Sequence, residues 1–124
     1  MNSNTQQALN FIKSNNYAEI KAGKERTTFL EIWMVVVENR IFARSWGFAE
    51  RSWYNTFLLD PFGQIKCGET IYNIKAVIPN DINALTTSIN QAYIDKYFFG
   101  GNIEYVNGII QQKHIDTTME FIVL

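Results

Sequence analysis

One run of β-branched and aromatic residues, TTFLEIWMVVVE over Thr27 to Glu38, constrains the fold more than any other feature of the chain. Such residues favour extended strands, and a run with so few polar positions suits a strand that is buried on both faces or lies inside a barrel. Glu38-Asn39 follows, and asparagine tolerates the positive φ that a two-residue hairpin turn requires. Arg40 to Arg44 is then predicted to return as the partner strand.

Counting outward from that turn gives the register of the hairpin. The pairs expected on one face are Val37 with Arg40, Val35 with Phe42 and Trp33 with Arg44. The other face is expected to carry Met34, Val36, Ile41 and Ala43. A slip of one residue would exchange the two faces, so the position of Arg44 beside Trp33 is the consequence to check.

The rest of the chain alternates helical and extended patterns. Helices are predicted over Thr5 to Ser14, from a Ser52 cap to about Leu59, from an Asn80 or Asp81 cap to Gly100-Gly101, and over Ile103 to about Ile110. The further strands are predicted over Tyr17 to Lys21, Gln64 to Cys67, Thr70 to Ile78 and Thr117 to Leu124. Hairpin-linked strands with helices between them favour an α+β fold, a small antiparallel split β-barrel of about six strands with flanking helices. Residues 1–124 are expected to form this one domain.

Composition limits the classes of partner. The net charge of −1 and the pI of about 5.8 leave no overall positive field for nucleic acid or anionic lipid, so neither is an expected partner. The longest apolar run, Ile32 to Val37, is far shorter than the ~20 residues that span a bilayer. The start of the chain lacks the pattern of a signal peptide, and the lone Cys67 cannot form an internal disulfide, so we expect a cytoplasmic protein. No Cys/His spacing suits a metal.

The segment RSWGFAERSWY, Arg44 to Tyr54, is the candidate binding site. Free N–H groups at a helix start attract anions, arginines and serines can add donors to the same anion, and a tryptophan can stack on a flat ring attached to it. The candidate cofactor-binding residues are Arg44, Ser45, Trp46, Gly47, Arg51, Ser52 and Trp53. In the alternative interpretation Ser52 only caps its helix, Trp53 and Tyr54 fill the core, and the arginine stems cover apolar surface.

Two further residues invite a chemical role. His114 lies in the polar segment QQKHID without a visible orienting partner, so we expect it to be exposed and not a general base. Cys67 lies within a predicted strand, which favours a buried thiol over a nucleophile. The mixture of basic and aromatic residues from Lys21 to Phe29 is expected to be a solvated loop. The sequence assigns no catalytic residue.

The ordered motifs in IWMVVVENRIFARSWGFAERSWYNTFLLDPFGQIKCG and AYIDKYFFG resemble an uncharacterised family of small bacterial proteins. The shared pattern is W-V-V, a hairpin, an aromatic, R-S, a glycine, S-W-Y, G-x-I and later A-Y-x-x-K-Y. The positions that match are Arg44, Ser45, Ser52, Trp53, Tyr54, Lys96 and Tyr97. That family is related to the FMN-binding split barrels around pyridoxamine 5′-phosphate oxidase. The resemblance therefore implies a six-stranded split barrel, a homodimer, and in many relatives a flavin-type cofactor at the dimer seam.

Two hypotheses of function follow. In the first, the protein is a homodimer that binds a small phosphorylated planar ligand, with FMN, a deazaflavin or a nucleotide-like molecule as the cofactor; an enzyme of this kind would be a flavin- or deazaflavin-dependent oxidoreductase. In the second, the chain is a cofactor-free dimerisation or interaction module in which the same aromatics form core and interface. The sequence does not choose between them, because one scaffold supports many functions.

Overall fold

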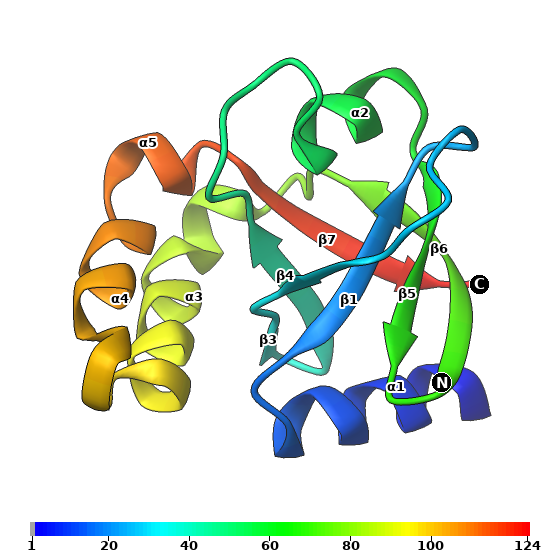
Figure 1. Cartoon of the computed structure of the whole chain (residues 1–124). Coiled ribbons are helices and arrows are strands. Elements are labelled where there is room, and N and C mark those ends of the chain that lie inside the picture. The colour runs from blue at the N-terminus through cyan, green and yellow to red at the C-terminus, as the bar shows by residue number, and fades with distance from the viewer. Residues whose placement is uncertain (1) are drawn as a thin grey trace.

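The computed structural model describes residues 2–124, which form an α+β fold around one antiparallel sheet that curls into a half-barrel (Figure 1). The strands are β1 (Ala18–Ala22), β2 (Leu30–Ile32), β3 (Val35–Val37), β4 (Arg40–Arg44), β5 (Phe62–Cys67), β6 (Thr70–Val77) and β7 (Thr118–Val123). The α-helices are α1 (Ser3–Ser14), α2 (Trp53–Leu59), α3 (Ile82–Tyr97), α4 (Ile103–Ile109) and α5 (Gln112–Ile115), with a 3-10 turn η1 (Gly100–Asn102) before α4. No helix within residues 2–124 is both long enough and apolar enough to cross a membrane.

The apolar run Thr27 to Glu38 supplies both edges of the sheet. The strand order is β2-β1-β5-β6-β7-β4-β3, so β2 and β3 lie at opposite edges although only Trp33 and Met34 separate them in the chain. The sheet must therefore curl until its two edges almost meet. The run was expected to be one strand, but the bend at Trp33-Met34 divides it, and for that reason the sheet has seven strands where about six were expected.

The predicted hairpin is present. Glu38 and Asn39 have φ of 54° and 60°, the left-handed values that this kind of turn requires. Val35 pairs with Phe42, Val36 with Ile41 and Val37 with Arg40, which confirms the register and the assignment of the two faces. The expected Trp33–Arg44 pair is wrong, because the bend takes Trp33 out of the ladder and Arg44 pairs with Thr118 of β7.

The interior of the half-barrel is the larger of two cores, and α1 and α2 lie across its two ends (Figure 1). Asn2 caps α1 by accepting a hydrogen bond from the Thr5 N–H at 2.7 Å, and the helix buries Leu9 and Ile12. At the other end Phe57 of α2 covers β5 at Gly63. A Cβ on Gly63 would lie 2.7 Å from the Phe57 ring and 2.6 Å from the Lys21 carbonyl oxygen, so only glycine fits there.

A second core lies between the outer face of the β3–β4 hairpin and the helices α3 and α4. Val35 and Phe42 pack there against apolar residues of α3, among them Ile89 and Tyr93. Trp33, at the bend, stacks on Tyr97 with ring centroids 4.1 Å apart and an interplanar angle of 7°. The position of α3 is therefore coupled to the bend that closes the sheet.

Lys96 and Tyr97, two of the motif positions, hold this bend to the end of α1. The Lys96 ammonium donates to the carbonyl oxygens of Ile12 and Met34, both at 2.6 Å, and the Tyr97 hydroxyl donates to the Asn16 carbonyl at 2.6 Å. Burial lowers the pKa of Lys96 to about 8. These contacts give both residues a structural role.

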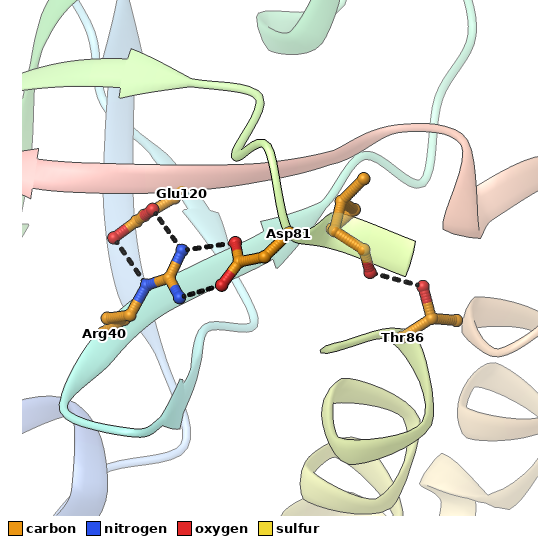
Figure 2. A network of polar contacts seen from close by, with 5 residues as sticks. Arg40, Asp81, Thr86 and Glu120 are labelled. Carbon is orange, nitrogen blue, oxygen red and sulfur yellow. Dashed lines mark hydrogen bonds and ion pairs between the residues drawn. The ribbon is translucent and has the colours of Figure 1, made fainter. Parts of the chain in front are cut away.

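A second polar network joins β4, β7 and the start of α3 (Figure 2). The Arg40 guanidinium donates to both carboxylate oxygens of Asp81, at 2.8 and 3.0 Å, and to both of Glu120, at 3.1 and 2.9 Å. Asp81 stands at the N-cap position of α3, as the sequence indicated, but its side chain makes no capping hydrogen bond and pairs with Arg40 instead. The network thus fixes the start of α3 against the sheet.

Candidate functional site

All seven predicted binding residues line one cavity of about 480 Å³. It lies where β2, the end of β4 and the segment from Ser45 to Ser52 face residues of α3 and α4. Its volume falls in the range of about 300–1,000 Å³ that is common for small-molecule sites. The residues that the sequence grouped by proximity are therefore also neighbours in space.

Arg44 is the most unusual residue of the cavity wall. Its side chain comes from the last position of β4 and is buried, with only 3% of its surface exposed. Its Nε donates to Thr118 Oγ1 at 2.9 Å, and its Nη1 donates to Asn90 Oδ1 at 2.5 Å and to the Ile109 carbonyl at 3.1 Å. Within residues 2–124 its Nη2 has no hydrogen-bond partner.

No carboxylate within residues 2–124 is paired with the Arg44 charge. Both ion pairs found in the described part of the chain belong to Arg40, and the three acceptors bonded to Arg44 are neutral. Burial lowers the pKa of Arg44, but an arginine stays protonated in a protein. The guanidinium carbon lies 5.5 Å from the centroid of the Tyr93 ring, a cation–π contact that offsets part of the cost of burial. The cavity wall therefore contains a fixed and uncompensated positive charge.

The two serines already bond within the chain. The Ser45 hydroxyl donates to the Gly47 carbonyl at 2.6 Å, and the Ser52 hydroxyl caps α2 by accepting from the Asn55 N–H at 3.3 Å. The helix that Ser52 starts has only seven residues. The Ser45 hydroxyl proton is therefore used within the chain, whereas Ser52 serves as an acceptor and α2 is too short to form an anion site by itself. The arginines are the cationic groups of the cavity.

The two tryptophans of the predicted site differ. Trp53 lines the cavity, but it is buried and packs edge-on against Phe57 and Phe121, at 6.2 and 5.6 Å between centroids. Trp46 is 50% exposed and leaves part of its ring open to a ligand. The structure thus has the Ser52 cap and the packed Trp53 ring that the alternative interpretation expected, while the Arg44 side chain is buried and hydrogen-bonded within the chain and does not lie along exposed apolar surface.

His114 is buried and 2% exposed, which corrects the expectation that it is exposed. The polar segment around it folds into α5, and the imidazole is enclosed between Trp46 and Phe48, with ring centroids at 4.6 and 4.8 Å. Its Nδ1 lies 3.0 Å from the Ser45 carbonyl oxygen, so Nδ1 must carry the proton of this hydrogen bond. A segment too short for any periodicity gave no sign of this burial in the sequence.

The same aromatic cluster depends on Gly108 of α4. The Cβ of any other residue there would lie 2.6 Å from the Trp46 ring. Trp46 also lies close to Tyr105, with ring centroids 5.5 Å apart and an interplanar angle of 61°. Trp46 is thus held by the stacked imidazole of His114 and by the close approach of Gly108.

Arg26 is a cavity residue that the sequence placed in a solvated loop. Its Nη2 donates to Thr56 Oγ1 at 2.8 Å and also to the Arg51 carbonyl oxygen. Among the described residues, the cavity lining includes Arg26, Arg44 and Arg51 but only one carboxylate, that of Glu31. The basic and aromatic mixture of the segment from Lys21 to Phe29 was the signal that could have revealed it.

The thiol of Cys67 is poorly suited to act as a nucleophile. Cys67 is a buried thiol, as expected, and burial raises its pKa to about 11, which suppresses the reactive thiolate. No cluster of three His, Cys, Asp or Glu side chains suited to a metal ion occurs in the part of the chain that the structure describes.

These features define a small α+β protein with a curled antiparallel sheet and an arginine-containing cavity at its side. The chain belongs to the bacterial family described as "Uncharacterized protein conserved in bacteria (DUF2255)", whose model matches residues 8–121. That span contains every predicted site residue.

Among solved structures, the chain is similar to the conserved hypothetical protein Rv2991 from Mycobacterium tuberculosis. The TM-score is 0.60, the sequence identity is 13%, and the match covers 100% of this chain and 80% of that one. At this identity the similarity concerns the fold alone. None of the curated proteins matches the chain.

Proposed function

We propose that the cavity binds a phosphorylated planar ligand of the flavin, deazaflavin or nucleotide type. The observation that carries the proposal is the Arg44 guanidinium, which is buried in the cavity wall without a counter-ion and with Nη2 unbonded within residues 2–124. Burying an unpaired charge costs several kcal/mol, so an anion that shares the site supplies the missing partner. Phosphate suits this site because its anionic oxygens can accept charge-assisted hydrogen bonds from the N–H groups of Nη2.

The other lining residues fit a flat ring attached to that anion. Trp33, Trp46 and Tyr105 contribute aromatic surface, and Arg26 and Arg51 add positive charge. Aromatic faces bind flat rings by offset stacking or edge-to-face contact. When bound, a flavin or deazaflavin would supply hydride transfer, while the residues of this chain would hold the phosphate, orient the ring and exclude water. An oxidoreductase activity is therefore the enzyme function that we propose for this site.

A homodimer is the proposed assembly. Four cavity-lining residues, Tyr17, Leu30, Trp46 and Tyr105, are about half exposed and border the opening of the cavity. A second copy of the chain placed over them would cover the open face of a bound ring. The same exposed residues favour the rival function, a dimerisation module without a cofactor, in which they would contact the partner directly.

The test is ligand binding by the purified protein. We expect FMN, a deazaflavin or pyridoxal 5′-phosphate to raise the melting temperature, since a ligand at 100 times its Kd adds about 2.7 kcal/mol of stability. Arg44→Gln, which removes the charge but keeps an amide donor, should abolish the rise.

The matched control is Arg40→Gln. Arg40 lies on the same strand, pairs with Asp81 and Glu120 and does not line the cavity, so this variant should melt earlier but retain the full rise with ligand. Absence of any rise in the wild-type protein would favour the cofactor-free module. Equal rises in the wild type and in Arg44→Gln would place the ligand elsewhere.

A further inference from the structure

Asn90 of α3 holds Arg44 without neutralising it. Its Oδ1 accepts from Arg44 Nη1 at 2.5 Å, while Asn90 itself does not line the cavity. An aspartate has almost the same shape as an asparagine and would make the same hydrogen bond with a full negative charge. The chain has an amide at the position where a carboxylate would complete a buried ion pair.

Arg40 shows the contrast within the same strand. Arg40 is more exposed than Arg44, yet it is bonded to the two carboxylates of Asp81 and Glu120. Arg44 is more buried and has greater need of a counter-ion, yet its acceptors are a hydroxyl, an amide oxygen and a backbone carbonyl. Neutral acceptors fix the direction of the guanidinium and leave its charge to act on whatever enters the cavity.

We infer that Asn90 is a positioning residue that determines charge specificity: its neutral amide orients the Arg44 guanidinium and leaves that charge available, so that the cavity selects the phosphorylated form of its ligand. This inference rests on the proposed function, because it concerns the same cavity. It adds a residue outside the cavity wall, and it makes the phosphate, more than the ring, the group by which ligands are distinguished.

The experiment compares FMN with riboflavin, which has the same ring and lacks the phosphate. Binding of each is measured by quenching of flavin fluorescence for the wild type, Asn90→Asp and Asn90→Leu. We expect Asn90→Asp to weaken FMN binding at least about tenfold, because a hydrogen bond to a charged partner is among the stronger ones and the new carboxylate takes up that charge. Riboflavin binding should change little.

Asn90→Leu separates positioning from charge. It removes the acceptor and leaves Arg44 charged, so its affinity for FMN should lie between those of the wild type and Asn90→Asp. The control for net charge is Asn83→Asp, which makes the same substitution at an exposed position of α3 outside the cavity and should bind FMN like the wild type.

Stability gives an independent readout. A carboxylate beside an unpaired buried guanidinium should raise the melting temperature of Asn90→Asp above that of Asn90→Leu. If Asn90→Asp melts below Asn90→Leu or does not fold, or if it binds FMN as well as the wild type does, the inference is overturned while the proposed function stands. If the wild-type protein binds no phosphorylated probe at all, the proposed function itself fails.

Discussion

Gly47 is a cavity residue at which a substitution is expected to affect ligand binding without affecting the stability of the fold. Its φ lies outside the left-handed region, and a Cβ added there would meet no atom within 4 Å. We expect Gly47→Ala to change the free energy of unfolding by no more than about 0.5 kcal/mol. Because Gly47 lines the cavity, the added methyl should still weaken the binding of FMN if the ligand approaches this part of the backbone.

Denaturant unfolding and FMN titration of the same variant check this expectation. Gly63→Ala is the contrasting control, because its Cβ would collide with a backbone oxygen and with the Phe57 ring. It should destabilise the protein by about 1–3 kcal/mol, the usual cost of overpacking. A loss of stability in Gly47→Ala of similar size would contradict the open space that the structure has at that residue.

The residues of the cavity were predictable where they are close in sequence. Arg44 to Trp53 stood out because arginines, serines and tryptophans are concentrated in one short segment. Asn90 was not predictable, since it reaches Arg44 across 46 positions of the chain and belongs to an ordinary helical pattern. The basic and aromatic composition around Arg26 was compatible with a cavity wall, but a solvated loop has the same composition, so this signal alone does not decide between them.

At the scale of the elements, the hairpin could be predicted from its turn residues and the helix α3 from its apolar spacing. The division of the run Thr27 to Glu38 into β2 and β3 could not be predicted, because nothing local to Trp33 and Met34 marks a bend. The bend exists because a curled sheet brings its two edges together, which is a property of all the strands at once. The helix α5 was missed because four residues are too few to show a periodicity.

The pair between Arg40 and Asp81 joins two elements and is expected to depend on pH. The hydrogen bond from Arg40 lowers the pKa of Asp81 in the folded state below the value of about 3.9 that it has when unfolded. A lowered carboxylate pKa adds stability that is present above about pH 4 and is lost as the pH falls through the folded value. Wild-type protein should therefore be more stable than Asp81→Asn at pH 7, and the difference should shrink below about pH 4.

Urea unfolding at pH 7 and at about pH 3 measures this difference. In an Arg40→Gln background the Asp81→Asn substitution should have little further effect, because the partner is already absent. A difference that remained the same at both pH values would show that the carboxylate acts through something other than its charge.

At the scale of the whole molecule, the predicted homodimer can be tested directly by measuring the mass of the protein in solution. Sedimentation velocity at micromolar concentration should give twice the chain mass of 14.4 kDa. Leu30→Asp, at the opening of the cavity, should shift the protein toward the monomer, since a charge there opposes burial in an interface. Leu59→Asp is the control, because Leu59 is even more exposed but does not line the cavity. A wild-type monomer, or dissociation by Leu59→Asp alone, would contradict this arrangement.

The short link between the two edge strands limits how the cavity can change its size. One side of the cavity is formed by residues 30–33. Only Met34 separates this side from Val35, which begins β3 at the opposite edge of the sheet. Each residue of extended chain spans at most about 3.3–3.6 Å, so the link through Met34 keeps the Trp33 end of that side within a few ångströms of β3 and limits its outward movement. The segment from Ser45 to Ser52 also lines the cavity and belongs to no helix or strand. We therefore expect this segment, which contains Trp46, to set the size of the largest ligand that the cavity accepts.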